Sequence, residues 1–430
     1  MNTLWVVVIA VVVIYAVYNY YAKKIDRDII QADAKKATPA KMYMDGVDFM
    51  PTSRNVLYGY HFKSIAAAGP IVGVITAANI WGWLPAILWL MIGVSFIGWA
   101  SDYSAIIVAV RNDGNSMSAV SHKLIAPRTR TILFTFIFFY LLLVAGAFLG
   151  IMAALMAARP DVPLGIIALA VMGLLAGQML YKWKMDLILV TAIVVIVTIL
   201  AIGFGPFGAT PNPETGGINW VGPINGAMVA FNRAVDGITG GNAVMTVTDP
   251  TKADPRIANP NLFNAETGEI KTMPSYLFWA LFLLAFSYLA STLPIWRFAQ
   301  PVNYIGFWVT LLTIGLSALG AILAPFIKPE VGAFALEAVK PLKWAPEAGA
   351  AWQPLWPMLF VTIACGAISG WHALFGSIGT ARQLEYETDA LPVGGGAMFT
   401  ENTLALLSLV AVSIAGTGGG AGRFAAGVGS

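Results

Sequence analysis

Long apolar segments are the feature that most constrains this chain. Crossing the roughly 30 Å hydrocarbon core of a bilayer takes roughly 20 apolar residues in an α-helix, and lipid offers the backbone no other hydrogen-bond partners. The composition agrees, at 58% hydrophobic and only 11% charged residues. We therefore predict an all-α polytopic membrane protein with about ten transmembrane helices. The expected spans are residues 3–21, 59–80, 83–110, 131–157, 163–181, 186–206, 274–296, 303–325, 355–377 and 398–415.

The loops between these spans indicate the orientation of the chain. Lysine and arginine concentrate on one side, which predicts that segment 22–57 is cytoplasmic. The first apolar run is too long for a signal-peptide core, so we expect it to be a retained span. Residues 207–273 and 326–354 fall outside; the first is expected to be an irregular cap, the second to hold one short amphipathic helix. On the cytoplasmic side, residues 116–125 have the spacing of a short interfacial helix.

The second span is interrupted by glycine and proline. Gly69 and Pro70 lie in its middle, and proline removes a backbone N–H and clashes with the preceding turn. Discontinuous helices of this kind form substrate and ion sites in secondary transporters, although an ordinary proline kink is the simpler alternative. Similar interruptions follow near Ser291 and Thr292 and, in the ninth span, around a tryptophan–histidine pair. We predict a substrate-binding cavity lined by His61, Gly69, Pro70, Ser291, Thr292, Trp371 and His372.

Asp102 is the clearest candidate for coupling transport to ions. It lies in an otherwise apolar span, where a carboxylate is costly unless it faces a cavity or a partner. A buried carboxylate that binds and releases a proton would serve this role; the alternative is a structural acid that accepts backbone hydrogen bonds. His61 and His372 are likewise either ligand-binding residues or structural residues that form hydrogen bonds. The three histidines of the chain are far apart and lack a carboxylate at metal-ligand spacing, so no metal site and no cofactor is expected.

An acidic loop precedes the last span. The sequence RQLEYETDALPVGGGAMFTE, residues 382–401, contains Glu385, Glu387 and Asp389 beside a proline and three glycines. It is either a gate held by ion pairs on the cytoplasmic side or a solvated connection. The glycine run lacks the context of a phosphate-binding loop, and no nucleophile arrangement is apparent, so the chain is not expected to be an enzyme. The net charge of +3 gives no indication of nucleic-acid binding.

Three stretches together resemble the carbon starvation protein A family of membrane transporters: GYHFKSIAAAGP, CGAISGWHALFGS and QLEYETDA. The resemblance implies proton-coupled uptake of peptides or small carboxylates such as pyruvate across the cytoplasmic (inner) membrane. It also implies a leucine-transporter-like fold with two inverted five-helix repeats. The expected organisation is then 1–57, an N-terminal helix and cytoplasmic linker; 58–206, a first repeat; 207–273, an extracytoplasmic loop; and 274–430, a second repeat.

The chain departs from the family pattern in three ways. A histidine expected before Asp102 is replaced by Ser101, and two charged residues expected after Pro301 are replaced by Val302 and Asn303. The second repeat is also expected to lack its last helix, which leaves three alternatives: the product is truncated, a partner membrane subunit supplies that surface, or the chain is a former transporter kept as a structural subunit. These departures leave an alternative function open, that of a transport-inactive structural membrane subunit of a larger complex.

Overall fold

The computed structural model describes residues 2–159, 162–204, 222–248, 263–264, 269–327, 329–340, 354–368 and 370–414. These residues fold almost entirely as helices and divide into two compact units. Unit 1 comprises residues 1–133 and 307–430, and unit 2 comprises residues 134–306. Two long helices, α9 (Pro127–Ala158) and α14 (Ala299–Ile327), carry the chain from one unit into the other.

Within the described ranges, eight helices are long and apolar enough to cross a membrane, or nine if one bent pair counts as a single span. They confirm that the chain is an all-α, multi-pass protein of the cytoplasmic membrane. The eight are Thr3–Ile30, Trp83–Val110, Pro127–Ala157, Val162–Lys182, Leu187–Phe204, Pro274–Thr292, Ala299–Ile327 and Glu387–Ile414. The inverted-repeat organisation stays a prediction.

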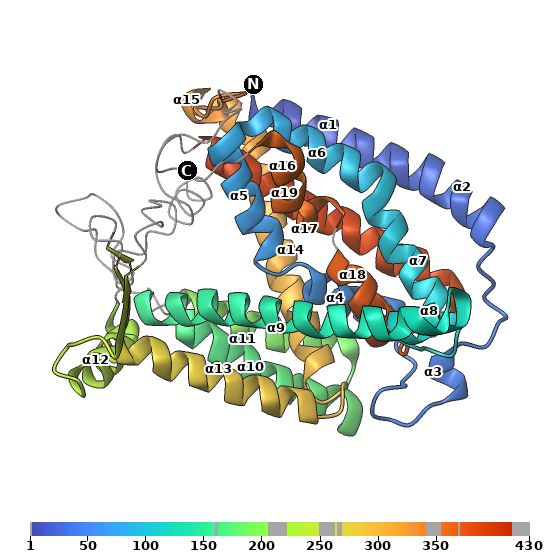
Figure 1. Cartoon of the computed structure of the whole chain (residues 1–430), viewed down its shortest axis with the longest axis horizontal. Coiled ribbons are helices and arrows are strands. Elements are labelled where there is room, and N and C mark those ends of the chain that lie inside the picture. Colours follow the sequence, from blue (N-terminus) through green and yellow to red (C-terminus); the bar gives the residue numbers. More distant parts are fainter. Residues whose placement is uncertain are drawn as a thin grey trace. The chain divides into compact units, whose positions relative to one another are not determined.

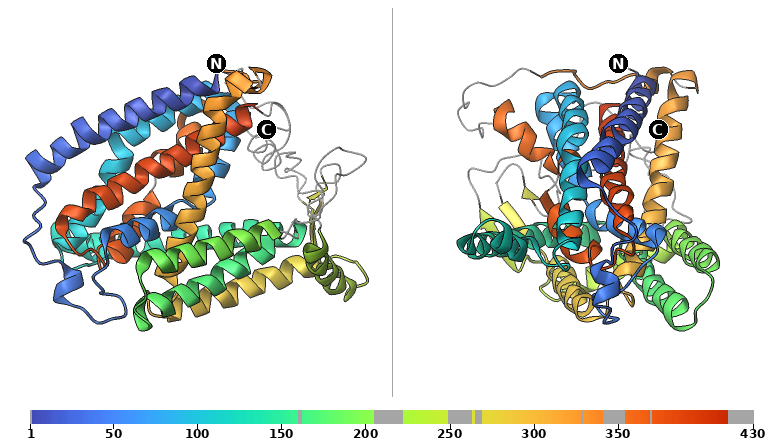
Figure 2. Two further views of the ribbon diagram at one scale, coloured as in Figure 1. Left: turned by 180° about the vertical axis from the view of Figure 1, so that it is seen from behind. Right: turned by 90° about the vertical axis from the view of Figure 1, so that its right-hand side faces the viewer.

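Unit 1 is built around its last helix, α19 (Gly396–Ile414), drawn in red in Figures 1 and 2. In the span that contains α19, 83% of the most apolar window is buried, against 44% or less for every other described span. The remaining elements of the unit are α1 (Thr3–Ala16), η1 (Val17–Ala22), α2 (Lys23–Ile25), η2 (Asp26–Ile30), α3 (Pro39–Met42), α4 (Arg54–Ile65), α5 (Gly69–Trp81), α6 (Trp83–Gly93), η3 (Val94–Gly98), α7 (Trp99–Val110), α8 (Met117–Leu124), α15 (Pro329–Gly332), α16 (Leu355–Thr362), α17 (Ala364–Ala367), α18 (Gly370–Phe375), η6 (Gly376–Thr380), η7 (Glu387–Asp389) and η8 (Leu391–Gly395).

Small residues allow the helices of unit 1 to pack closely. A Cβ added at Gly73 of α5 would lie 2.2 Å from the carbonyl oxygen of Thr362, and one at Gly98 would lie 2.5 Å from that of Ala367. Helix association in membranes depends on such backbone approach, because lipid tails are as apolar as the side chains. The short helices α16 and α17 are thereby held against the longer ones.

The predicted break in the second span is present. Helix α4 ends at Ile65, α5 begins at Gly69, and their axes differ by 42°. Pro70 therefore occupies the first turn of a new helix, where its missing N–H costs no intrahelical hydrogen bond. The predicted ninth span differs from expectation: residues 355–377 form the separate helices α16, α17 and α18 and the start of η6 rather than one continuous helix.

Unit 2 contains the helices α10 (Val162–Gly177), η4 (Gln178–Lys182), α11 (Leu187–Phe204), α12 (Pro223–Gly237) and α13 (Pro274–Thr292) and a small antiparallel sheet. The strands β1 (Met245–Thr248), β2 (Phe263–Asn264) and β3 (Glu269–Thr272) pair in the order β1-β3-β2, with Met245 opposite Thr272 and Phe263 opposite Ile270. One core of the unit surrounds Met156 and Trp279, and another surrounds Met172 and Val190.

The expectation of an irregular cap at 207–273 is corrected by α12, the 15-residue helix in this segment. Met228 and Phe231 of α12 pack on the core around Trp279, and the indole of Trp279 donates to the Asn232 side chain at 2.9 Å. The glycines and prolines that flank α12 mask its helical periodicity in the sequence. Residues 207–221, 249–262 and 265–268 of the expected cap lie outside the described residues.

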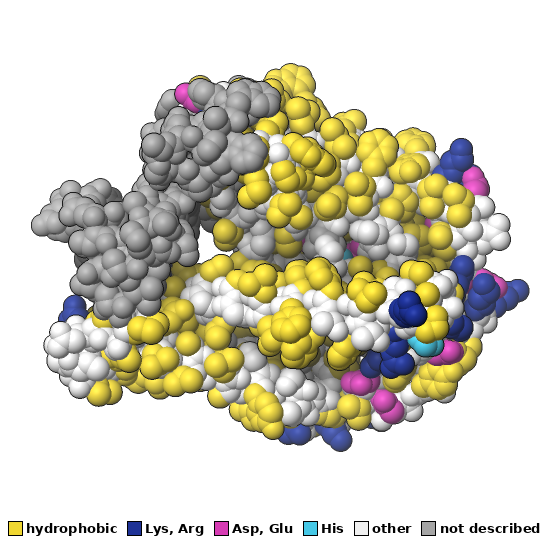
Figure 3. Space-filling model, in the orientation of Figure 1, with side chains coloured by type: hydrophobic (Ala, Val, Ile, Leu, Met, Phe, Trp, Pro, Cys, Tyr) yellow, Lys and Arg dark blue, Asp and Glu magenta, His cyan; other side chains and the backbone are white. Residues whose placement is uncertain are grey.

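Charged side chains of unit 1 gather at the end that carries α3 and α8, and apolar side chains cover the rest of its visible face (Figure 3). Helix α8, Met117–Leu124, confirms the short helix expected at 116–125. This end of the unit therefore corresponds to the side that the basic loops mark as cytoplasmic.

Candidate functional site

Four ionisable side chains meet inside unit 1, each from a different helix. His61 comes from α4, Asp102 from α7, His372 from α18 and Glu401 from α19. Their side chains are at most 1% exposed. We call these four residues the buried cluster. The sequence separates them by as much as 340 positions, so only the packing of unit 1 brings them together.

One carboxylate oxygen of Asp102 is within hydrogen-bond distance of both imidazole rings. Its Oδ2 lies 3.0 Å from Nε2 of His61 and 3.1 Å from Nδ1 of His372. The other ring nitrogen of His61 lies 2.6 Å from the hydroxyl of Thr380 in η6, which fixes the orientation of that ring. Gly376 of η6 lies directly beside the carboxylate, since a Cβ there would be in van der Waals contact with Oδ1 of Asp102 at 3.4 Å. Asp102 is thus buried inside the protein, as its sequence context predicts.

His372 also contacts the second carboxylate. Its Nε2 lies 2.6 Å from Oε2 of Glu401, close enough for an ion pair although the angles are not those of an aligned hydrogen bond. The other carboxylate oxygen of Glu401, Oε1, accepts a hydrogen bond from the thiol of Cys365 in α17 at 3.5 Å. The cluster therefore forms a line from Thr380 through His61, Asp102, His372 and Glu401 to Cys365.

The charge of the buried cluster depends on its protons. Two ionised carboxylates beside two neutral imidazoles carry a net charge of −2, which two added protons cancel. Because isolated charge is costly in a low-dielectric interior, the burial of all four groups favours partial or full neutralisation by protons. Among the described residues, no group of three or more His, Cys, Asp or Glu side chains has the geometry of a metal site. The chemistry that this arrangement supports is proton binding.

The interrupted second span lies directly beside the cluster. At its break, the carbonyl of Ser64 accepts the indole N–H of Trp371 at 3.2 Å, and the carbonyl of Ala66 accepts from Lys63 at 3.3 Å. These side chains satisfy backbone groups that a continuous helix would have paired. At the start of α5, a Cβ on Gly69 would lie 2.7 Å from Sγ of Cys365.

The structure thus brings together His61, Gly69, Trp371 and His372 of the predicted substrate site. Pro70 joins them, because a Cβ added at Gly366 of α17 would lie 3.7 Å from its Cβ. Ser291 and Thr292 lie at the end of α13, in the other unit, and are exposed. Their hydroxyls donate to the carbonyls one turn back, those of Tyr288 and Leu289.

The acidic loop before α19 is held by ion pairs. Glu387, 1% exposed, accepts from Nε of Arg111 at 2.6 Å and from the backbone N–H of Asp33 at 2.8 Å, with Lys36 3.8 Å away. At Glu387, the loop is therefore buried and held by ion pairs, and the alternative of a solvated connection is wrong there. The loop leads directly from η6, which carries Thr380, into α19, which carries Glu401.

The partner of this loop is the segment between the first two spans, residues 31–54, which we call the strap. Its backbone runs beside the loop, with the N–H groups of Met50 and Thr52 donating to the carbonyls of Arg382 and Gln383. Three further ion pairs tie the strap to the loop, namely Lys41–Glu385 at 3.6 Å, Arg54–Asp389 at 3.7 Å and Arg382–Asp48 at 3.3 Å. The loop residues that the sequence proposes as a gate all contact the strap.

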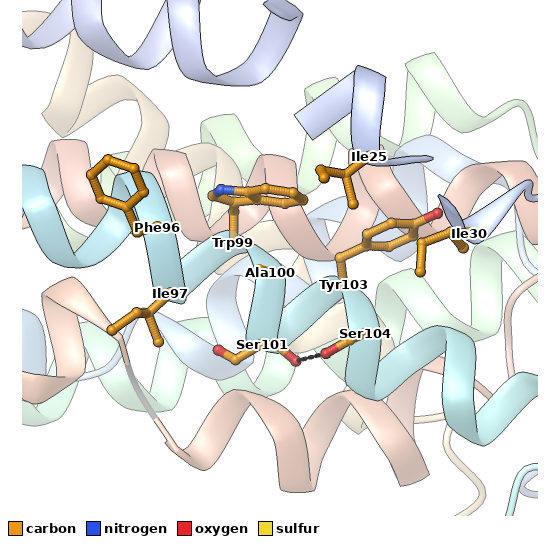
Figure 4. Close-up of a pocket in the computed structure, with 9 residues that line it drawn as sticks. All are labelled: Ile25, Ile30, Phe96, Ile97, Trp99, Ala100, Ser101, Tyr103 and Ser104. Atoms are coloured by element: carbon orange, nitrogen blue, oxygen red, sulfur yellow. Dashed lines mark hydrogen bonds between the residues drawn. The ribbon is translucent and has the colours of Figure 1, made fainter. Parts of the chain in front are cut away.

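A separate pocket of about 330 Å³ lies on another side of α7. Trp99 and Tyr103 project from α7 toward Ile25 and Ile30 of the first span, and Phe96 closes one end (Figure 4). Its lining also includes Ala100, Ser101 and Ser104. Because Asp102 projects to the other side of α7, this largely apolar pocket is distinct from the buried cluster.

Sequence reasoning missed two members of the site. Glu401 was assigned to the acidic loop, although it is followed by the apolar run 402–414 and lies one turn inside the last span. That position within an apolar span is the signal that identifies it. Thr380 carries no comparable signal.

The departures from the family pattern have local explanations. Ser101 donates to the carbonyl of Gly98 at 3.0 Å and does not take part in the cluster, where His61 and His372 supply the imidazoles. Val302 packs so tightly on α10 that a Cβ at Gly173 would lie 2.1 Å from it. Asn303 donates to the carbonyl of Ala299, one turn back, at 2.8 Å.

Comparison with known proteins agrees with these features. A family model described as carbon starvation protein CstA matches residues 2–214 and 259–419. The chain is 29% identical over 416 residues to a pyruvate/proton symporter, BtsT, of Escherichia coli, covering 96% of this chain and 49% of the relative. It is 30% identical over 410 residues to a peptide transporter, CstA, of Campylobacter jejuni, covering 95% of this chain and 50% of the relative.

A peptide transporter, CstA, of Bacillus subtilis is 28% identical over 423 residues, which cover 96% of this chain and 58% of the relative. The chain thus spans about half the length of these curated relatives. No solved structure matches it. Because the family model covers most of the sequence, the chain belongs to the carbon starvation protein CstA family.

Proposed function

We propose that this chain mediates proton-coupled uptake of peptides or small carboxylates such as pyruvate across the cytoplasmic membrane. The buried cluster is the observation that carries the proposal. Ionisable residues inside a membrane protein are costly and mark ion or proton pathways, and here two carboxylates and two imidazoles lie in contact at 2.6–3.1 Å. The relatives are named as a pyruvate/proton symporter and as peptide transporters, which supports transport rather than catalysis.

In this proposal, Asp102 binds the coupling proton and the broken span contributes to the substrate site. Gly69, Pro70 and Trp371 lie at the break, where the regular helical hydrogen bonding of the second span is interrupted. The loop residues Glu385 and Asp389, together with Glu387, form a cytoplasmic gate with the strap. Opening this gate would displace both ends of the loop, and therefore both Thr380 and Glu401.

The test is uptake by the full chain reconstituted in proteoliposomes, with labelled pyruvate or a labelled dipeptide and an imposed pH gradient. We expect accumulation that a protonophore abolishes. The variant Asp102→Asn should fold, lose accumulation driven by the pH gradient, and retain exchange of labelled for unlabelled substrate. Accumulation that is independent of the pH gradient, or normal in the variant, would exclude this coupling role.

A transport-inactive structural subunit is the second candidate. The replacement of two expected charges by Val302 and Asn303, whose side chains make local contacts, is the observation that favours it. This function predicts no uptake of either substrate class and a stable stoichiometric membrane partner on purification.

A further inference from the structure

We infer that Glu401 is a second proton-binding carboxylate of the buried cluster and that His372 passes the proton between Asp102 and Glu401. This inference rests on the proposed function in assigning the proton to symport. It extends that function because it replaces a single coupling acid by a pair of acids joined through one imidazole.

A proton on one of the two facing atoms accounts for the short contact between His372 and Glu401. Nε2 of the ring and Oε2 of the carboxylate are 2.6 Å apart, and two lone pairs at that distance would repel each other. The proton resides either on Nε2 of the ring, facing the Glu401 carboxylate, or on Oε2 of Glu401, facing an unprotonated Nε2. Either position keeps two lone pairs from facing each other between side chains that are at most 1% exposed.

The opposite ring nitrogen makes His372 a two-ended carrier. Nδ1 faces Oδ2 of Asp102 at 3.1 Å. A proton on Asp102 can pass to Nδ1 while the proton on Nε2 passes to Glu401. The Asp102 O–H and ring Nε2–H bonds break, and a ring Nδ1–H and a Glu401 O–H bond form. The starting acid becomes a carboxylate, the ring stays neutral in its other tautomer, and Glu401 becomes the acid.

The surroundings of Glu401 place this end of the relay beside the broken span. Cys365 contacts Glu401 at 3.5 Å, and its Sγ is also the atom nearest to a Cβ built on Gly69. The next residue, Asn402, fixes the rotation of α19 by donating to the carbonyls of Leu90 and Gly366 at 3.1 and 2.8 Å. A change in protonation at Glu401 is therefore two contacts away from the first residue of α5.

Three titratable groups and one hydroxyl surround the pair of His372 and Glu401 and affect its response to pH. Asp102 faces His372 from α7, His61 faces Asp102 from α4, and Cys365 faces Glu401 from α17. Thr380 of η6 faces the far side of His61. Because these groups interact at contact distance, we expect the two carboxylates to titrate together rather than as separate sites.

Infrared difference spectroscopy of the full chain in lipid, recorded between pairs of pH values, tests the inference without substrate. Protonated carboxyl groups give a C=O stretching band that ionised ones lack. We expect Glu401→Gln to remove part of this band and Asp102→Asn to shift the pH midpoint of the part that remains. Asp28→Asn, which changes a carboxylate that is 42% exposed and paired with Arg27, is the matched control and should reproduce the wild-type midpoint.

Two outcomes would overturn the inference. One is a Glu401→Gln spectrum that matches the wild type at every pH; the other is a Glu401 midpoint that Asp102→Asn leaves in place. Because glutamine cannot carry a proton, His372→Gln should make Asp102 and Glu401 titrate independently. If this variant does not fold, the Glu401→Gln and Asp102→Asn spectra still test the inference. Absence of uptake by the wild type would instead overturn the proposed function and leave the infrared result standing.

Discussion

Gly69 and Cys365 approach so closely that a Cβ on Gly69 would lie 2.7 Å from Sγ of Cys365 and 3.1 Å from its Cβ. Gly69 is the first residue of α5, and Cys365 contacts Glu401 of the buried cluster. This glycine therefore lets the broken span pack directly against Cys365, which flanks the buried cluster.

We predict that Gly69→Ala displaces the Cys365 side chain and destabilises the protein by about 1–3 kcal/mol, the usual cost of overpacking. Thermal unfolding in detergent measures the effect. Cys365→Ala in the same chain should recover part of the loss, because it removes Sγ but leaves the Cβ contact. Gly315→Ala is the control, since a Cβ there meets nothing within 4 Å. Equal melting temperatures for Gly69→Ala and Gly315→Ala would contradict the prediction.

Thr380 provides a second prediction, about the orientation of His61. Its hydroxyl lies 2.6 Å from Nδ1 of His61, and both side chains are fully buried. Thr380→Val should leave that ring nitrogen without a partner and cost about 1–3 kcal/mol, while Thr380→Ser keeps the hydroxyl and should be close to wild type. Unfolding measurements give the cost, and the pH dependence of uptake reports whether the ring has turned away from Asp102. A valine variant as stable as the serine variant would show that the hydroxyl is dispensable.

The sequence predicts the helices well because their signal is local. An apolar run needs no distant partner to identify it, and Gly69-Pro70 breaks a helix through its own backbone chemistry. The buried cluster has no such signal: Asp102 meets His61 across 41 positions and His372 across 270. Its separate residues were therefore candidates in the sequence, while their contact and the inclusion of Glu401 required the packed unit.

Interruptions in apolar runs were the weaker guide. Gly69-Pro70 opens α5 beside the cluster, but the polar residues Ser291 and Thr292 simply end α13, and their hydroxyls pair with carbonyls one turn back. Serine and threonine bond readily to nearby carbonyls of their own helix. A proline near small or polar residues thus accompanies both a helix end and a break within a span, and local sequence does not distinguish them.

A third prediction concerns acid and the turn at residues 45–49 of the strap. Oδ1 of Asp45 accepts the backbone N–H groups of Val47, Asp48 and Phe49 at 2.8, 2.9 and 2.9 Å. Burial acts to raise the pKa of Asp45, but these donors outweigh it and hold the pKa below its usual value. Because the folded pKa lies below the unfolded value of about 3.9, this stabilisation is complete above that pH and is lost as the pH falls through the folded pKa.

Hydrogen-exchange protection of residues 45–54, corrected for the intrinsic rate at each pH, measures this loss. We expect protection that is constant near neutral pH and falls in acid. Asp45→Ala should show the low protection at every pH, because alanine offers no acceptor. Since the turn presents Asp48 and Phe49 to Arg382, the variant should also weaken the contact with the loop. Protection that falls equally in wild type and variant would point to other groups.

The last prediction is that Arg111, at the end of α7, contributes more than any other single ion pair to holding the acidic loop in place. The guanidinium donates to the buried Glu387 at 2.6 Å and to the carbonyl of Ile30 at 2.8 Å, so it connects the end of the first span to the loop. Arg111→Gln leaves a buried carboxylate short of its main cation and should cost about 1–3 kcal/mol. Hydrogen exchange should rise in residues 31–54 and in the loop. Arg27→Gln removes an exposed pair with Asp28 and should leave stability and hydrogen exchange close to those of the wild type. Adding Glu387→Gln to Arg111→Gln should recover part of the loss, because the unpaired charge is then gone. If the two arginine variants behave alike, the ion pair at Glu387 does not hold the loop.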